Sequence, residues 1–136
     1  MQANKMLMQS IFSELAKGNG RPFVDAMADD FCWTFKSNGV WRGSYRGKRT
    51  VREDLLAPLM AQFADRYTNT ALRLIAEGEH VVIECQGRVT TKSGQPYNNQ
   101  YCYVCRIEGG QLKELTEYMD TALAEAVLAP PARPGT

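Results

Sequence analysis

The sequence predicts an α+β fold in which helices cover one face of a curved antiparallel sheet. Apolar residues recur at helical spacing in the first part of the chain, and four segments of strand-like character follow one another after it. Two of these strands are long for a chain of 136 residues, and the last segment ends in a carboxylate pair, Glu117 and Asp120. This combination favours a sheet that curves around a small-molecule pocket.

Length and charge limit the class of protein. A chain of 136 residues is long enough to bury one hydrophobic core. Its 16 basic and 15 acidic side chains nearly cancel, so we expect neither nucleic acid nor an anionic membrane as a main partner. No apolar run has the length of a signal peptide or of a membrane span, which leads us to expect a cytoplasmic protein that binds a small molecule.

Two helices are expected before the first strand. Between Ala3 and Lys17 apolar residues lie three and four positions apart, and the turn Gly18–Gly20 ends the pattern. Pro22 suits the first turn of a second, short helix, because its missing N–H would have no partner there. We expect this helix to include the acidic pair Asp29–Asp30.

A strand and a third helix follow. Large apolar residues alternate with smaller ones over Phe31–Phe35, which predicts the first strand. Thr50 and Glu53 have the spacing of a capping box and predict the start of a helix that continues to about Phe63. Pro58 is expected to kink this helix, because an interior proline removes one backbone hydrogen bond.

The rest of the domain is predicted to be a run of strands. They are expected at Thr68–Glu77, Val81–Thr91, Tyr97–Ile107 and Leu112–Thr121. Strand parity places Cys85, Tyr101 and Tyr103 on the more apolar rows, which we assign to the concave face. A single domain is expected to end at Leu128, because residues 129–136 are rich in proline and are expected to be disordered.

Two stretches carry a resemblance to a known superfamily. They are WTFKSNGVWRGSYRGKRTVREDLLAPL (residues 33–59) and GQPYNNQYCYVCRIEGGQLKELTEYMDT (residues 94–121), within the element order helix, helix, strand, helix and four strands. The sequence resembles the nuclear transport factor 2-like superfamily, in its SnoaL-like or ketosteroid-isomerase-like branch, over roughly residues 5–125. The resemblance implies a cone-shaped half barrel packed against about three helices, a pocket between sheet and helices, and a homodimer.

The resemblance indicates the fold more specifically than the reaction, because this superfamily includes isomerases, cyclases, dehydratases, epoxide hydrolases and proteins without catalysis. Residues 31–52 contain no Asp or Glu, so the base that ketosteroid isomerases carry near the first strand is missing. Cys85 and Gly87 stand where limonene-type epoxide hydrolases would have an arginine and an aspartate. The catalytic residues of ketosteroid isomerases and those of limonene-type epoxide hydrolases are therefore both incomplete in this sequence.

We expect neither a metal nor a cofactor. Cys102 and Cys105 have the spacing of a metal motif, but residues three apart in a strand face opposite sides of the sheet. The single histidine, His80, lies in a predicted turn and is interpreted as solvated.

Glu117 is the candidate acid or base, because strand register points it into the cone. Burial among Trp33, Phe63 and Tyr103 would raise its pKa towards neutrality. Tyr101 and Tyr103 on the inner row are the candidate partners that polarise a carbonyl oxygen, although ordinary packing is the alternative for both. The alternative for Glu117 is a salt-bridged residue at a sheet edge.

Further side chains are candidates for ligand contact. They are Trp33, Trp41, Phe63, Cys85, Asn99 and Asp120. Core packing is the alternative for the two tryptophans, and a strand-end hydrogen bond is the alternative for Asn99. Asp120 has a competing role as the cap of a helical turn over residues 122–128.

Three functions remain open from the sequence. The first is a cofactor-independent isomerase, cyclase or dehydratase-like enzyme acting on a small apolar or carbonyl-containing molecule. The second is a non-catalytic ligand-binding or dimerisation module. The third is a protein-binding surface on the outer sheet face, formed by Glu84, Gln86, Arg88 and Thr90.

Overall fold

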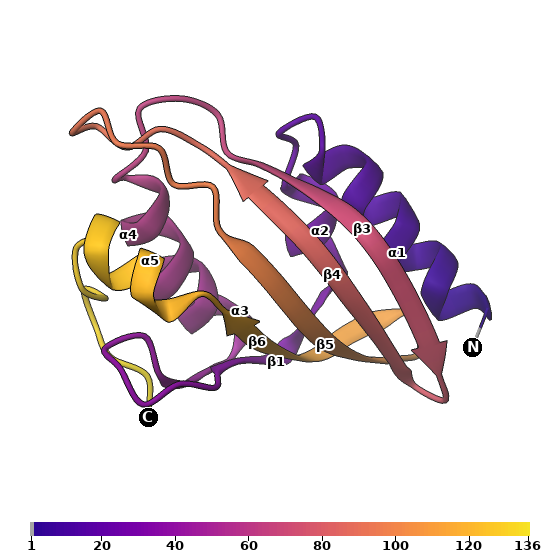
Figure 1. The fold of residues 1–136 in the computed structure, drawn as a ribbon. Helices are drawn as coiled ribbons and strands as arrows, with labels where there is room; N and C mark the ends of the chain where they lie inside the picture. The colour runs from indigo at the N-terminus through magenta and orange to yellow at the C-terminus, as the bar shows by residue number, and fades with distance from the viewer. Residues whose placement is uncertain (1) are drawn as a thin grey trace.

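A six-stranded sheet forms the frame on which the helices pack (Figure 1). The structure is a computed structural model, and it describes residues 2–136. In chain order the elements are α1 (Gln2–Leu15), α2 (Arg21–Ala26), β1 (Met27–Phe35), β2 (Gly43–Arg46), α3 (Lys48–Thr50), the π-helical segment η1 (Val51–Leu56), α4 (Ala57–Met60), β3 (Thr68–Glu77), β4 (His80–Arg88), β5 (Gln100–Glu108), β6 (Gln111–Met119) and α5 (Thr121–Val127).

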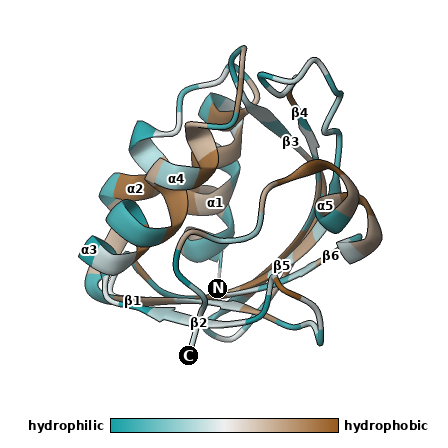
Figure 2. Cartoon of the chain, turned by 90° about the vertical axis from the view of Figure 1, so that its left-hand side faces the viewer, coloured by the Kyte–Doolittle hydropathy of each residue, from teal (hydrophilic) through white to brown (hydrophobic). Residues whose placement is uncertain are grey.

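The strand order is β2-β1-β6-β5-β4-β3, so the last strand in sequence lies in the interior of the sheet. β1 and β6 run parallel, and the other neighbouring pairs are antiparallel. The sheet curves around the space that the helices face and does not close into a barrel (Figure 2). The predicted α+β half barrel, with its mostly antiparallel sheet, is confirmed.

The hydrophobic core lies between the concave sheet face and the helices. α1 lies beside β3 and buries one side, formed by Met8, Ile11, Phe12 and Leu15. On β4, Ile83 and Cys85 are buried while Glu84 and Arg88 are exposed, which confirms the predicted concave row. Among residues 2–136, no helix combines the length and apolar character that a membrane crossing needs.

The prediction that the second helix includes the acidic pair is wrong. α2 ends at Ala26, and β1 begins at once with the buried Met27. Asp29 and Asp30 are exposed residues of β1, within a shift of the β1–β6 register. The Asp30 carboxylate accepts a hydrogen bond of 3.0 Å from the ammonium of Lys113 on β6. This long-range pairing decides the strand, and a local helix pattern cannot reveal it.

The third helix starts earlier than predicted. Gly47, with a φ of 97° that favours glycine, precedes it, and Thr50 makes no side-chain cap. Glu53 instead forms an ion pair with Arg49 one turn earlier, at 2.6 Å. The irregularity expected from Pro58 lies in the π-helical turns of η1 just before it, where the regular α-helical bonding pattern is lost.

The end of the chain lies against β2, a short strand that the sequence analysis did not predict. Thr136 and Ser44 exchange two backbone hydrogen bonds of 3.1 and 2.9 Å. The Tyr45 hydroxyl donates to the carbonyl oxygen of Arg133 at 2.7 Å. These bonds differ from the expectation that the proline-rich tail adds nothing to the sheet: its final residue, which follows the last proline, has a free N–H to donate.

Candidate functional site

A cavity of about 590 Å³ lies between the concave sheet face and the helices, within the size range of small-molecule sites. Its wall is largely apolar and includes many aromatic side chains. The aromatic lining residues are Phe23, Trp33, Phe35, Trp41, Phe63, Tyr67, Tyr97, Tyr101 and Tyr103. Such a wall excludes water from polar groups inside it and offers flat contact surfaces to a ligand.

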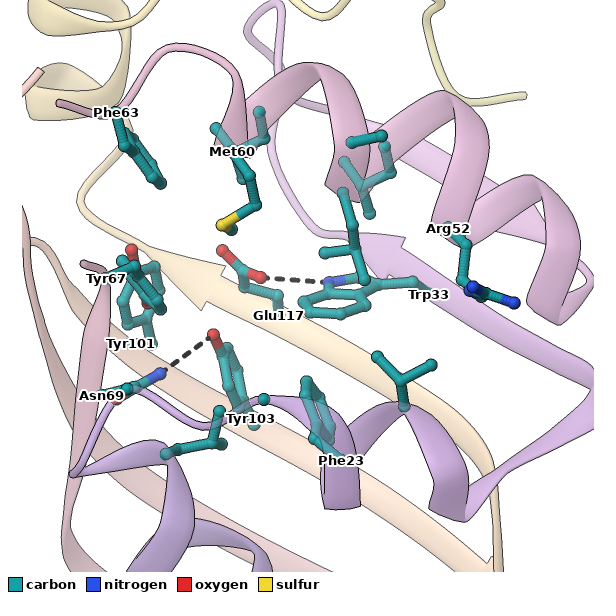
Figure 3. Close-up of a pocket in the computed structure, with 18 of the residues that line it drawn as sticks. Phe23, Trp33, Arg52, Met60, Phe63, Tyr67, Asn69, Tyr101, Tyr103 and Glu117 are labelled. Carbon is teal, nitrogen blue, oxygen red and sulfur yellow. Dashed lines mark hydrogen bonds between the residues drawn. The ribbon is translucent and has the colours of Figure 1, made fainter. Parts of the chain in front are cut away.

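Glu117 is the acidic side chain in the depth of this wall. It lies on β6, opposite Phe35 of β1 and Tyr103 of β5, and only 5% of its surface is exposed. The indole N–H of Trp33 donates a hydrogen bond of 3.0 Å to its Oε1 (Figure 3). Its other oxygen points away from Trp33, toward the side of the cavity where Met60 lies.

The environment of Glu117 holds the proton on its carboxyl group. Burial disfavours the charged form and raises the pKa from 4.5 to about 8, and the hydrogen bond from Trp33 opposes this shift only in part. Within residues 2–136 no lysine, arginine or histidine forms a salt bridge with Glu117. The edge salt bridge considered from the sequence is therefore not formed, and Glu117 is poised to exchange a proton near neutral pH.

Two tyrosines face the cavity beside Glu117. Tyr101 and Tyr103 are buried on β5 with ring centroids 5.4 Å apart, and burial holds the pKa of both hydroxyl groups well above 10. Each is therefore a hydrogen-bond donor at neutral pH. The side-chain N–H of Asn69 donates to the Tyr103 hydroxyl oxygen at 3.4 Å, which leaves the O–H of Tyr103 available to a ligand (Figure 3).

Comparison with known proteins agrees with this arrangement of sheet, helices and cavity. The SnoaL-like domain family matches residues 8–115. The chain belongs to this family. The comparison with curated proteins found no match.

Solved structures share the fold of this SnoaL-like chain. An NTF2-like protein of unknown function from Burkholderia pseudomallei has a TM-score of 0.78 at 21% identity, over 95% of this chain and 100% of that one. A putative SnoaL-like polyketide cyclase from Jannaschia has a TM-score of 0.75 at 20% identity, over 96% and 94% of the two chains. TerC, co-crystallized with polyporic acid, has a TM-score of 0.76 at 16% identity, over 92% and 97%. At these identities the likeness shows a common NTF2-like fold.

The structure places most of the sequence-predicted site residues around one cavity. Those that line it are Glu117, Tyr101, Tyr103, Trp33, Trp41 and Phe63. Cys85, Asn99 and Asp120 are not among the lining residues. The Cys85 thiol is 2% exposed, and burial raises its pKa, so it is a protonated packing group.

Asn99 and Asp120 have structural roles instead. The side-chain N–H of Asn99 donates to the Tyr97 hydroxyl at 2.8 Å and to the Asp120 carbonyl at 3.1 Å. The Asp120 carboxylate accepts from the Leu123 N–H at 3.2 Å and caps α5. These bonds match the alternatives that the sequence left open for both residues.

Several lining residues were not predicted from the sequence. Tyr67 immediately precedes β3 and Asn69 is its second residue, and strand alternation alone does not indicate a cavity there. Arg52 and Met60 line the cavity from the helical side. No group of three His, Cys, Asp or Glu side chains within residues 2–136 converges as a metal site would.

The pH dependence of stability tests the protonation of Glu117. Its pKa is raised from 4.5 to about 8 on folding, so the folded protein keeps a proton that the unfolded chain loses. The associated stabilisation is complete below about pH 4.5 and declines as the pH rises to about 8, by up to roughly 1.4 kcal/mol per pH unit. Urea unfolding should show this decline in the wild type relative to Glu117→Gln. If the difference in unfolding free energy between the wild type and Glu117→Gln did not change with pH, the assignment would be contradicted. The matched control is Glu114→Gln, an exposed change on the same strand.

The structural role of Asn99 gives a second prediction. Asn99→Ala leaves the Asp120 carbonyl and the Tyr97 hydroxyl without a buried donor, so we expect the unfolding free energy to fall by about 1–3 kcal/mol. Asn38→Ala, in an exposed loop, should change it by less than about 0.5 kcal/mol. Unchanged stability of Asn99→Ala in urea unfolding would argue against the structural role.

Proposed function

We propose that this SnoaL-like protein binds a small apolar or carbonyl-containing molecule and catalyses a proton transfer on it without a cofactor. The observation that carries the proposal is the carboxyl group of Glu117, buried in the cavity wall with its pKa raised to about 8. A group that titrates near the working pH serves well as a general acid or base. Isomerisation, ring closure and dehydration are the reaction types that such a group supports.

Each of these reactions begins with the same step. The ionised Glu117 takes a proton from the carbon next to a carbonyl group, and the C–H electron pair moves to the carbonyl oxygen to give an enolate. The O–H of Tyr103 or Tyr101 donates to that oxygen as its negative charge grows. Return of the proton to another carbon completes an isomerisation. Attack of the enolate carbon on a second carbonyl closes a ring, and the alkoxide that forms takes the proton back from Glu117. Loss of a β-hydroxyl group as water, with the proton from Glu117, completes a dehydration instead.

Neighbouring side chains prepare both partners for this step. Tyr103 and Glu117 lie directly opposite each other on adjacent strands and face the same cavity. The hydrogen bond from Asn69 to the Tyr103 oxygen polarises the phenol and makes its O–H a stronger donor. Trp33 acts as a positioning residue, because its bond to Oε1 fixes the carboxyl and leaves the second oxygen free.

The comparisons support a small-molecule function. One structure with the same fold is described as a putative polyketide cyclase, and another was co-crystallized with polyporic acid. Both descriptions concern those proteins. For this chain, the cavity and its carboxyl group support the proposal.

Deuterium exchange into a model ketone tests the proton transfer without knowledge of the natural substrate. We expect the wild type in D₂O to accelerate exchange at the α-carbon of 2-tetralone, measured by mass spectrometry, with a rate that rises with pH to a midpoint of about 8. Glu117→Gln should lose about a hundred- to ten-thousand-fold of the acceleration. Glu114→Gln should retain it. Equal rates for wild type and Glu117→Gln would overturn the catalytic role.

A non-catalytic ligand-binding module is the second candidate. Its support is the aromatic wall of the cavity, together with the bond of Glu117 to Trp33 in place of a bond to a phenol. In that case Glu117→Gln would bind 2-tetralone as the wild type does, and neither protein would accelerate exchange.

We also propose that the outer sheet face forms a homodimer. A row of uncharged side chains crosses four adjacent strands on this face through Ile75, Val82, Val104 and Thr116. Ile75 is 55% exposed, and Tyr118 nearby on the same face is 47% exposed. An uncharged, mostly apolar row of this kind favours pairing with a second copy over a solvated protein-binding face.

Light scattering after size-exclusion chromatography tests the dimer. We expect twice the mass of one chain for the wild type and the mass of one chain for Ile75→Glu. Met6→Glu, which places the same charge on an exposed apolar residue of α1, should remain dimeric. A monomeric wild type at micromolar concentration would contradict the proposal.

A further inference from the structure

We propose that the ligand of the cavity is a flat aromatic carboxylate that carries a hydroxyl group at its opposite end. Its hydroxyl donates to Oδ1 of Asn69, and its carboxylate binds at Arg52, on the exposed side of the cavity. The inference rests on the proposed function only in taking this cavity as the ligand site. It adds the chemical class of the ligand and the direction in which the ligand lies.

The side-chain oxygen of Asn69 lacks a partner. Asn69 is 2% exposed and lines the cavity, and its N–H group already donates to Tyr103. Its Oδ1 is fully buried without a hydrogen-bond partner within residues 2–136. A buried acceptor left unpaired costs about 1–3 kcal/mol. Since this oxygen only accepts, the group that completes it must be a donor, such as a ligand hydroxyl.

Basic side chains dominate the charge around the cavity. Those that line it are Arg21, Lys48, Arg52 and Arg66, whereas Asp25 and the buried Glu117 are the acidic lining residues. None of the four basic groups forms an ion pair with another side chain in residues 2–136. Their positive charge is therefore not neutralised by the protein and favours an anion. An arginine guanidinium matches the two oxygens of a carboxylate.

The two features lie on opposite sides of the proposed reaction centre. Figure 3 shows Asn69 beside Tyr103 on one side of the Glu117–Trp33 pair, and Arg52 beyond Trp33 on the other. A ligand that reaches both places its middle next to Glu117. The exposed Arg52 marks the solvent side, and the buried Asn69 marks the inner end.

The walls between these ends suit a flat molecule. Trp33 packs edge-on against Tyr103 with centroids 6.0 Å apart, and Phe63 stacks on Tyr67 at 5.7 Å. These rings are held by their neighbours and present rigid faces, so a planar aromatic ligand loses little conformational entropy when it binds.

Calorimetric titration with matched naphthalenes tests the inference. The probe is 6-hydroxy-2-naphthoate, with its neutral methyl ester and 6-methoxy-2-naphthoate as comparators. We expect the probe to bind about tenfold more tightly than either one, which corresponds to about 1.4 kcal/mol at each end. The preference over the ester should shrink as salt is raised, because Arg52 is exposed.

Variants assign the two preferences to their residues. Arg52→Gln should reduce the preference for the acid over the ester to about twofold or less, and Arg88→Gln, an exposed change on β4 outside the cavity lining, should leave it intact. Asn69→Leu should remove the preference for hydroxyl over methoxy. Asn69→Ser is measured alongside in case the leucine variant does not fold, and the comparison of the three probes on the wild type needs no variant at all.

The outcomes separate this inference from the proposed catalysis. An ester that binds as tightly as the acid, a methoxy compound that binds as tightly as the phenol, or no binding of any probe at about millimolar concentration would overturn the inference. If the preferences hold while Glu117→Gln exchanges deuterium as fast as the wild type, the ligand class stands and the catalytic proposal fails. If exchange depends on Glu117 while the neutral probes bind best, the catalytic proposal stands and the inferred ligand class fails.

Discussion

The buried hydrogen bond between Trp33 and Glu117 is the interaction on which the site depends. It joins β1 to β6 across 84 positions of sequence, in the one parallel pairing of the described sheet. An ionisable carboxyl in an aromatic wall is costly unless it is paired or protonated. Here the carboxyl group has a single neutral donor, the indole N–H of Trp33. This one hydrogen bond fixes the orientation of the carboxyl group but does not keep it ionised. The raised pKa, the direction of the free oxygen and the placement opposite Tyr103 all follow from this balance between burial and one hydrogen bond.

The fold supplies the conditions for that balance. β6 lies between β1 and β5, so both of its neighbours contribute side chains to the wall around Glu117. The sheet curves around the space that the helical segment 48–60 faces, and large rings line this space without filling it. The same curvature brings the start of β3 to the cavity, where Asn69 meets Tyr103. A flat sheet would pack solidly against the helices and leave no room for a ligand.

Strand parity was sufficient to predict the part of the site that lies on regular strands. Glu117, Tyr101 and Tyr103 follow from alternation on β5 and β6, and the half barrel came from the family resemblance. The predictions that were wrong or missing concern segments whose structure is determined by long-range contacts. The β1 pairing overrides the helix pattern around Asp29–Asp30, and β2 is formed by its pairing with β1, which is distant from any local pattern. The partners of Asn99, and the register shift in β3 beyond Asn69, depend on segments far apart in sequence, so composition and spacing carry no signal for them.

The protonation of Glu117 is the central claim, and carbon-13 NMR of the glutamate carboxyl groups during a pH titration measures it most directly. The resonance that disappears in Glu117→Gln belongs to this residue. We expect its midpoint at about 8 in the wild type and higher in Trp33→Phe, since loss of the indole donor removes the contact that favours the ionised form. A midpoint near the ordinary value of 4.5, unmoved by Trp33→Phe, would show that the carboxyl group is solvated and would contradict the account of the site.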